Sequence, residues 1–177
     1  MVESETKKII AVMMVSFPNY KPMNIDSVVT VWTDMLAEYT YKQIDMALRA
    51  YIQTDTSGFA PSIGQLINKV HTIEKPEPLS EMEAWSLVSR ALRNGYYGAE
   101  QEFDKLPKIV QKAVGTPSQL RNWSQTSIES IENVIQSNFM RTYRAVVSRE
   151  KEIEKMPVRI QEVIKTVNSD SMKRLEG

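Results

Sequence analysis

The chain has 177 residues, 42% of them hydrophobic, which is enough for one ordinary domain or two small ones with a real core. Lysine plus arginine equals aspartate plus glutamate at 22 each, so the basic excess of a dedicated non-specific nucleic-acid binder is missing. Without cysteine there are no disulfides, catalytic thiolates or cysteine-based zinc sites, and the single histidine, His71, excludes a multi-histidine metal site within one chain. We therefore expect no cofactor and no metal, and a cytoplasmic location.

Helical periodicity runs through the whole sequence. Apolar residues recur at spacings of three and four and glycine is scarce, which predicts an all-α fold. The pattern of Ser or Thr followed three residues later by Glu or Gln predicts capping boxes, in which a side chain satisfies a free N–H at a helix start. It begins at Thr40, Ser62, Ser80, Thr116 and Thr126. Asn24 is a further expected N-cap.

The first half of the chain predicts an N-terminal helical domain over residues 1–74. Its apolar run at 7–17 is too short to span a bilayer, so we interpret it as a buried first helix and expect no membrane partner. The expected helices are 4–16, 24–38, 41–54 and 62–73. Each is too short to be stable alone and must pack on the others. The second should bury Val28, Val31, Trp32, Met35 and Leu36.

The segment EKPEPLS at 74–80, with two prolines and three charges, predicts a linker at 75–80, after which a second helical domain covers 81–155. The fold class is thus two small helical bundles joined by a short proline-containing linker, with an amphipathic C-terminal tail at 156–177. Gly95 is expected to end the helix over 81–94 in the left-handed conformation. Further helices are expected at 99–105, 107–114, 117–122 and 127–153.

No pattern typical of an active site is present. The sequence contains neither a phosphate-binding loop followed by Lys and Ser or Thr nor a dinucleotide fingerprint. Carboxylates such as Glu81 and Glu83 are two residues apart and therefore point to different faces of a helix. The stretch GYYG at 95–98 has the spacing of a KH-type phosphate clamp, but that module needs strands, so a turn between helices is favoured. We expect a protein that is not an enzyme.

One segment is locally basic. The segment from Lys108 to Arg149 contains six basic residues and only two acidic ones. Arg141 and Arg144 share a helix face, and Arg121 and Trp123 are expected in a loop. Basic residues interleaved with aromatic ones can bind single-stranded nucleic acid through phosphate contacts and stacking. The alternative is a solvated face with Trp123 packed into the core.

The tail offers a second candidate surface. Its segment VRIQEVIKTV is expected to place five apolar side chains close to one stripe: Val158, Ile160, Val163, Ile164 and Val167. Such a helix either docks on its own domain or fills a groove on a partner.

A resemblance adds to these observations. The elements that carry it are an amphipathic opening helix, the pair Trp32 and Leu36 on the next helix, a third helix ending in AYI, and FAPS with Phe59, Pro61 and Ser62. In this order, residues 1–74 resemble the loader/inhibitor proteins of replicative helicases in phages of Gram-positive bacteria. In local terms, Pro61 restricts the residue before it, Ser62 caps the fourth helix, and Phe59 is expected to pack onto that helix as a hydrophobic staple.

The resemblance implies a phage DNA-replication accessory protein that acts in the cytoplasm of the infected bacterium. Such adaptors bind a hexameric DnaB-type replicative helicase, load or inhibit it through protein–protein contacts, and work with an origin-binding initiator. The family's helicase contact is assigned to a flexible region after the N-terminal domain, whereas residues 80–153 here are expected to fold, so no contact residue is carried over. The alternative is a DNA-binding replication initiator or regulator that uses a basic face in 108–149. A third interpretation is a structural phage protein or an inhibitor of a host process.

Overall fold

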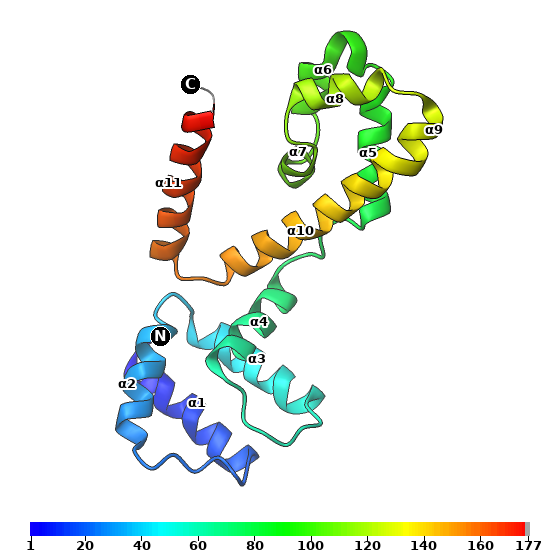
Figure 1. Ribbon diagram of the computed structural model, residues 1–177. Helices are drawn as coiled ribbons and strands as arrows, with labels where there is room; N and C mark the ends of the chain where they lie inside the picture. The colour runs from blue at the N-terminus through cyan, green and yellow to red at the C-terminus, as the bar shows by residue number, and fades with distance from the viewer. Residues whose placement is uncertain (176–177) are drawn as a thin grey trace. The chain divides into compact units, whose positions relative to one another are not determined.

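The computed structural model describes the backbone of residues 1–175. The side chains of Ile128, Glu132 and residues 168–175 lie outside the description. Over the described residues all regular secondary structure is helical, which confirms the all-α prediction (Figure 1).

The described chain divides into two compact units. One contains Met1–Glu77 with Pro157–Ile160, and the other contains Pro78–Met156 with the residues from Gln161 onward. Each has a hydrophobic core of its own. The domain limits expected from the sequence stay a prediction.

The N-terminal unit is built from α1 (Glu3–Ser16), α2 (Ile25–Met35), α3 (Tyr41–Thr54) and α4 (Ile63–Glu74). α1 packs on α2 and on α3, and α3 packs on α4. The buried side chains from these helices and their connections are Ile9, Ile10, Met13, Phe17, Val29, Leu36, Ile44, Ala47, Leu48, Leu66 and Val70.

The predicted caps of this unit are present. The Asn24 side chain accepts a hydrogen bond from the Ser27 amide at 2.9 Å, and both Thr40 and Ser62 form complete capping boxes. These contacts satisfy N–H groups that have no partner inside the helix, which fixes where each helix begins.

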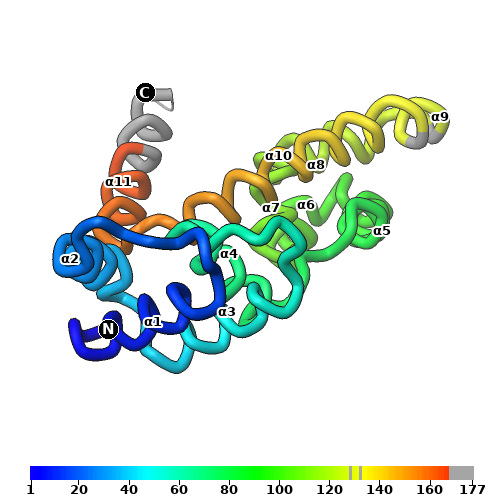
Figure 2. The backbone as a smooth tube through the Cα atoms, turned by 90° about the horizontal axis from the view of Figure 1, so that it is seen from below, coloured from blue at the N-terminus to red at the C-terminus, as the bar shows by residue number. Residues whose placement is uncertain are grey.

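The buried face of α2 differs from the prediction. Val29 is buried, whereas Val31 and Met35 are about half exposed, at 51% and 55%. Figure 1 and Figure 2 both show α2 at the outer edge of the unit, with α3 and α4 on the opposite side. One neighbouring helix covers only part of the surface of α2, so the apolar residues on its other face stay exposed.

The second unit begins with α5 (Glu81–Leu92), α6 (Gly95–Asp104), α7 (Lys108–Val114) and α8 (Pro117–Ser124). It continues through α9 (Ile128–Ser130), a π-helical turn (Ile131–Ile135) and α10 (Gln136–Glu154). Its buried core residues are Ala84, Trp85, Val88, Ala91, Leu92, Leu106, Val110, Ala113, Val114, Leu120, Phe139 and Tyr143.

Two of the three predicted caps in this unit are present. Ser80 forms a capping box with Glu83, and the Thr116 side chain accepts from the Gln119 amide. The prediction for Thr126 is wrong, because the helix begins one residue later and Ser127 accepts from the Ser130 amide at 3.4 Å. The Thr126 hydroxyl instead donates to the Asn122 carbonyl at the end of α8.

Gly95 has a different role from the predicted one. It is not a left-handed C-terminal residue but the buried first residue of α6. A Cβ added to it would lie 3.2 Å from the Ser124 Cβ and 3.6 Å from the Leu120 carbonyl oxygen. Glycine at this position therefore lets α6 approach α8 closely. α6 starts at 95 rather than 99, and its backbone is kinked at Gly98.

A buried amide closes the turn between α6 and α7. The Gln111 Nε2 donates to the carbonyls of Phe103, Asp104 and Leu106 at 3.0, 3.3 and 2.8 Å. The Phe103 and Asp104 carbonyls belong to the last turn of α6, which lacks donor partners within the helix, and the Leu106 carbonyl lies in the turn that follows. The side chain thereby replaces backbone donors, which matters because Pro107, at the start of α7, has no N–H.

The last described helix, α11, spans Val158–Leu175. Within the N-terminal unit the Val158 amide, at its start, donates to the Glu38 carboxylate at 2.9 Å, a favourable place for a negative charge. None of the described helices has both the length and the apolar content needed to cross a bilayer.

Candidate partner-binding surfaces

The described acidic side chains and the histidine do not form a metal-binding group of three or more. The carboxylates of Glu81 and Glu83 each form a hydrogen-bonded contact within the second unit. Arg144 binds Glu81 and lowers the pKa of its carboxyl, mainly by hydrogen bonding. The Ser80 hydroxyl and amide, in that order, lower the pKa of Glu83 in the capping box. His71 lies beside Tyr39, with its Nε2 3.4 Å from the phenol oxygen.

The basic segment is partly neutralised within its own unit. Arg144 holds Glu81 through two hydrogen bonds, Nε to Oε1 at 2.6 Å and one terminal nitrogen to Oε2 at 2.9 Å. Lys112 pairs with Glu150 at 2.8 Å. These cations would have to leave a partner before binding a phosphate, which weakens the nucleic-acid interpretation.

The aromatic side chains of the same segment pack against one another inside the second unit and are not exposed to a ligand. Trp123 lies in α8, not in a loop as predicted, and its ring meets Phe139 edge-on with centroids 6.5 Å apart. Tyr143 is buried, stacks on Phe139 at 5.9 Å and donates to the Leu79 carbonyl at 2.9 Å. These rings are therefore not free to stack on bases. Arg121 and Arg141 remain exposed on separate helices.

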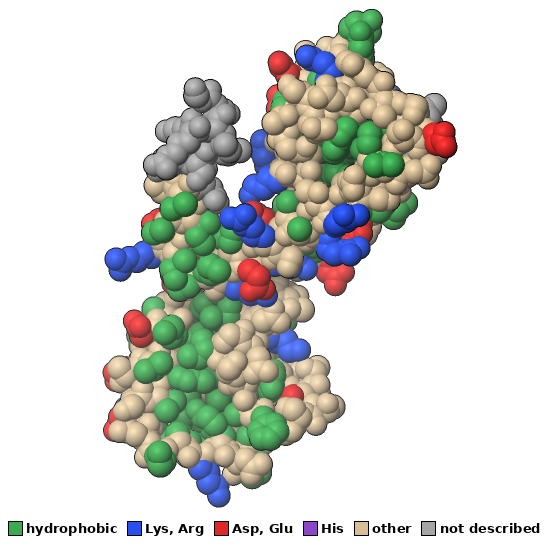
Figure 3. Space-filling view, in the orientation of Figure 1, with side chains coloured by type: hydrophobic (Ala, Val, Ile, Leu, Met, Phe, Trp, Pro, Cys, Tyr) green, Lys and Arg blue, Asp and Glu red, His purple; other side chains and the backbone are tan. Residues whose placement is uncertain are grey.

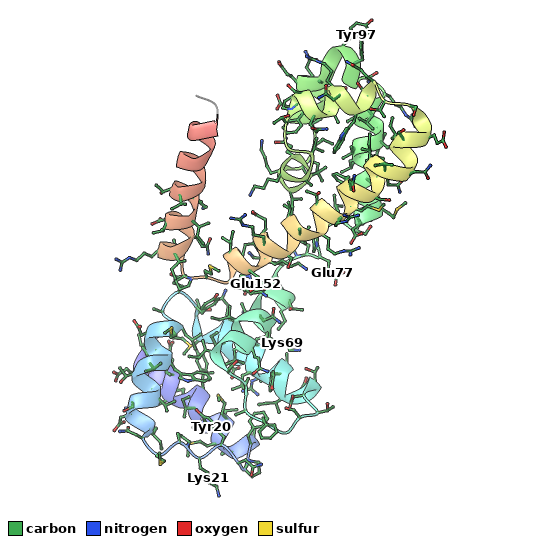
Figure 4. All side chains as sticks on the ribbon, viewed as in Figure 1. Tyr20, Lys21, Lys69, Glu77, Tyr97 and Glu152 are labelled. Atoms are coloured by element: carbon green, nitrogen blue, oxygen red, sulfur yellow. The ribbon has the colours of Figure 1, made fainter. Side chains whose placement is uncertain are left out.

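The GYYG stretch also presents aromatic side chains, but inside a helix. Tyr96 and Tyr97 form an edge-to-face pair with centroids 4.4 Å apart, and Tyr97 is 92% exposed. Figure 4 shows Tyr97 projecting from the tip of the second unit. The two glycines serve the packing and the kink of α6 rather than a phosphate clamp.

The tail surface consists of the apolar residues of α11, which we name the α11 stripe: Ile160, Val163, Ile164 and Val167. Ile160, Val163 and Val167 are about half exposed, and Ile164 is partly buried. At about 100° per residue these four side chains fall on one face of the helix. Val158 lies about half a turn away from them and is not part of the stripe, contrary to the sequence interpretation.

A second apolar surface lies on α2 and was missed at the sequence level. Val31 and Met35 are one helical turn apart and both about half exposed, and Figure 3 shows hydrophobic side chains gathered on the N-terminal unit. Other exposed apolar side chains of this unit include Val2, Met14, Val15, Met23 and Ile25. The signal was available: α2 carries apolar residues over a wider arc than one neighbouring helix can cover. Apolar patches of this kind mark protein-binding sites.

The FAPS stretch is a helix start with one departure from prediction. Ser62 caps α4 and Pro61 is buried, but Phe59 is 66% exposed and does not form a staple. The loop before it is held differently, since the Gly58 amide donates to Asp55 and Gly58 has φ of +74°. Phe59 lies three positions before the cap, which is too far for a staple, because the apolar residue of a staple directly precedes the cap.

The family comparison concerns the N-terminal unit. The family model for the N-terminal domain of the phage helicase loader/inhibitor gp39P matches residues 1–67, which include Phe59, Pro61 and Ser62. Comparisons with curated proteins and with solved structures give no match. The match confirms the resemblance noted from the sequence and indicates a protein associated with a phage helicase. Residues 1–67 are therefore similar to the N-terminal domain of the phage helicase loader/inhibitor family, and the family model does not extend over the second helical unit.

Proposed function

We propose that the protein is a phage DNA-replication accessory protein that binds a hexameric DnaB-type replicative helicase and loads or inhibits it. The observation that carries this proposal is the match of residues 1–67 to the N-terminal domain of the loader/inhibitor family. The protein acts as a non-enzymatic adaptor in the infected bacterial cytoplasm, with the origin-binding initiator as a second partner.

The exposed apolar surfaces support binding by protein–protein contact. A helix with an apolar stripe binds a partner by laying that stripe into a hydrophobic groove. Burying a whole aliphatic side chain contributes about 1.5–3 kcal/mol, so each half-exposed side chain of the α11 stripe adds roughly 1 kcal/mol. The three most exposed members together then change the dissociation constant about 100-fold, since about 1.4 kcal/mol corresponds to tenfold.

The test is co-elution of the full chain with the cognate replicative helicase, with and without ATP. A truncation ending at Met156 removes the whole tail. A triple variant, Ile160→Gln, Val163→Gln and Val167→Gln, removes only the exposed apolar side chains, and its matched control replaces Arg159, Glu162 and Lys165 by Gln on the polar side. We expect binding about 100-fold weaker for the apolar variant and nearly unchanged for the control.

Three outcomes separate the parts of this proposal. If the full chain forms no complex with the helicase at micromolar concentration, the helicase function is wrong. If the complex forms and survives the truncation, the function stands and the contact lies in the folded units. If the polar control weakens binding as much as the apolar variant does, the contact is electrostatic and the α11 stripe is not its basis.

A further inference from the structure

The second unit carries a surface groove that is separate from the α11 stripe. Two hollows of about 620 and 730 Å³ adjoin between α5 and the helical run that ends in α10. The first lies against Leu79, Tyr143 and Val147, and the second against Trp85 and Leu92. Met82 lines both hollows, so we name the pair the Met82 groove.

The floor of the Met82 groove is apolar and its central residue is adaptable. Met82 is 61% exposed although it lies between two hydrophobic hollows, and its sulfur is 3.7 Å from Gln136 Nε2. Methionine side chains are flexible and polarisable, which suits a surface that moulds to an incoming side chain. From Gln136 to Lys151 the α10 wall extends about 22 Å, which is about four turns of a docked helix.

The charges around the groove indicate what it accepts. Arg93 lines the second hollow and Lys151 the first, and neither has an ion pair with a described side chain. The acidic residue lining the groove, Glu81, is already bound through both oxygens by Arg144. The groove therefore presents uncompensated positive charge near both ends of an apolar floor.

Segments of this protein itself fit the groove poorly. The α11 stripe is accompanied by Arg159, Glu162 and Lys165, so the segment over 158–167 is net basic. Its positive charge would meet the free cations of the groove, whether it came from the same chain or from a second copy. Nucleic acid would match the cations, but the Tyr143 and Trp85 rings are buried and cannot stack on bases.

We propose that the Met82 groove receives an amphipathic helix of a partner protein whose apolar stripe has acidic residues at both ends. This deepens the proposed function and rests on it, because it gives an adaptor a second, separately addressed contact. Affinity comes from the apolar floor, and the two cations select the acidic sequence and fix its position.

The test uses two synthetic peptides of about 16 residues, both with leucine at i, i+3, i+4 and i+7. One carries glutamate at both ends and the other lysine. Binding to the full chain is measured by fluorescence anisotropy, and the site by NMR of ¹³C-labelled methionine methyl groups. We expect the acidic peptide to bind at least tenfold more tightly and to shift the Met82 methyl signal. The Met23 methyl, on the other unit and fully exposed, should not move.

Variants separate the floor from the charges. Met82→Gln should weaken the acidic peptide about tenfold, while Val134→Gln, an exposed position of the same unit outside the groove, should not. The pair Arg93→Gln and Lys151→Gln should make the two peptides bind equally. All four positions are on the surface, so folding should persist, and circular dichroism checks this.

Several results would overturn the proposal. These are equal or tighter binding of the lysine peptide or of a single-stranded oligonucleotide, or peptide-induced shifts elsewhere than at Met82. A Met82 shift that depends on protein concentration without peptide would assign the groove to a second copy instead. If the helicase binds wild type and Met82→Gln equally, the groove is not its contact while the proposed function stands. If the helicase binds neither protein, the proposed helicase function is wrong, and the peptide experiment then remains the test of the groove.

Discussion

Replacing Gly95 by alanine sets two effects of opposite sign against each other. Alanine in a helix is normally more favourable than glycine by about 0.5–1 kcal/mol, because a chain with alanine at that position loses less conformational entropy when it folds. Here the new Cβ would lie 3.2 Å from the Ser124 Cβ and 3.6 Å from the Leu120 carbonyl oxygen. Both atoms belong to α8, whose backbone would have to move. Overpacking costs about 1–3 kcal/mol, so we expect a net destabilisation of about 0.5–2 kcal/mol.

Gly98 on the same helix provides the matched control. A Cβ there would meet the Gln101 Oε1 at 3.0 Å, the end of a flexible side chain that can turn away. Gly98→Ala should therefore change stability by less than about 0.5 kcal/mol, the usual range for a surface change. The comparison keeps the helix and the substitution constant and varies only what the new methyl group meets.

The assay is urea unfolding followed by tryptophan fluorescence in a Trp32→Phe background. The remaining tryptophans, Trp85 and Trp123, both lie in the second unit, so the signal reports that unit alone. If Gly95→Ala is as stable as the parent, or if Gly98→Ala is the more damaging change, the close approach of α6 to α8 does not explain glycine at position 95.

Three further predictions concern the caps, the core and the ion pair. Ser62→Ala should lower the stability of the N-terminal unit by about 1 kcal/mol, measured by Trp32 fluorescence, whereas Phe59→Ala should change it little. Phe139→Ala should cost the second unit about 3–5 kcal/mol in urea unfolding, because the buried ring contacts Trp85, Trp123 and Tyr143. The pKa of Glu81 is lowered in the folded state, so its pairing with Arg144 stabilises the fold above the ordinary carboxyl range. The difference in stability between wild type and Arg144→Gln should shrink as pH falls through that lowered value.

Each of these has a contrary result. A loss on Phe59→Ala equal to that on Ser62→Ala would restore the staple. A small effect of Phe139→Ala would mean that the aromatic cluster is loosely packed. A stability difference for Arg144→Gln that is constant with pH would show that Arg144 acts through something other than the Glu81 charge. Raising the salt concentration should also reduce that difference, since both side chains lie near the surface.

Most helix starts were predictable because their cause is local, although the cap at Thr126 and the start of α6 were predicted wrongly. Ser62 and Gln65 are three residues apart, and no distant residue is needed for their hydrogen bonds. The resemblance of the N-terminal domain was likewise visible, because order and spacing along the chain carry it. The periodicity of α2 predicted a helix, but the prediction that Val31 is buried failed, because burial depends on which neighbours cover each face.

The candidate sites were less predictable because their chemistry depends on partners far along the chain. Arg144 looked like a free cation, yet its partner Glu81 is 63 residues away. Trp123 looked like a loop residue, yet the ring it meets belongs to α10. The Met82 groove could not be predicted at all, since α5 and the helical run through α10 form it only once they are packed together.

The turn between α6 and α7 requires a hydrogen-bond donor at the position that the side-chain nitrogen of Gln111 occupies. Three carbonyl oxygens converge on one nitrogen, so the site accepts a donor and repels an acceptor. A glutamate of the same size would need a proton on the oxygen that faces these carbonyls, because ionisation would turn that contact into a repulsion. The opposing influence is Lys108, whose Nζ donates to the Gln111 Oε1 at 3.1 Å and would favour the ionised form. Gln111→Glu would thus convert a silent structural residue into a group that couples folding of the second unit to pH, with stability falling as pH rises.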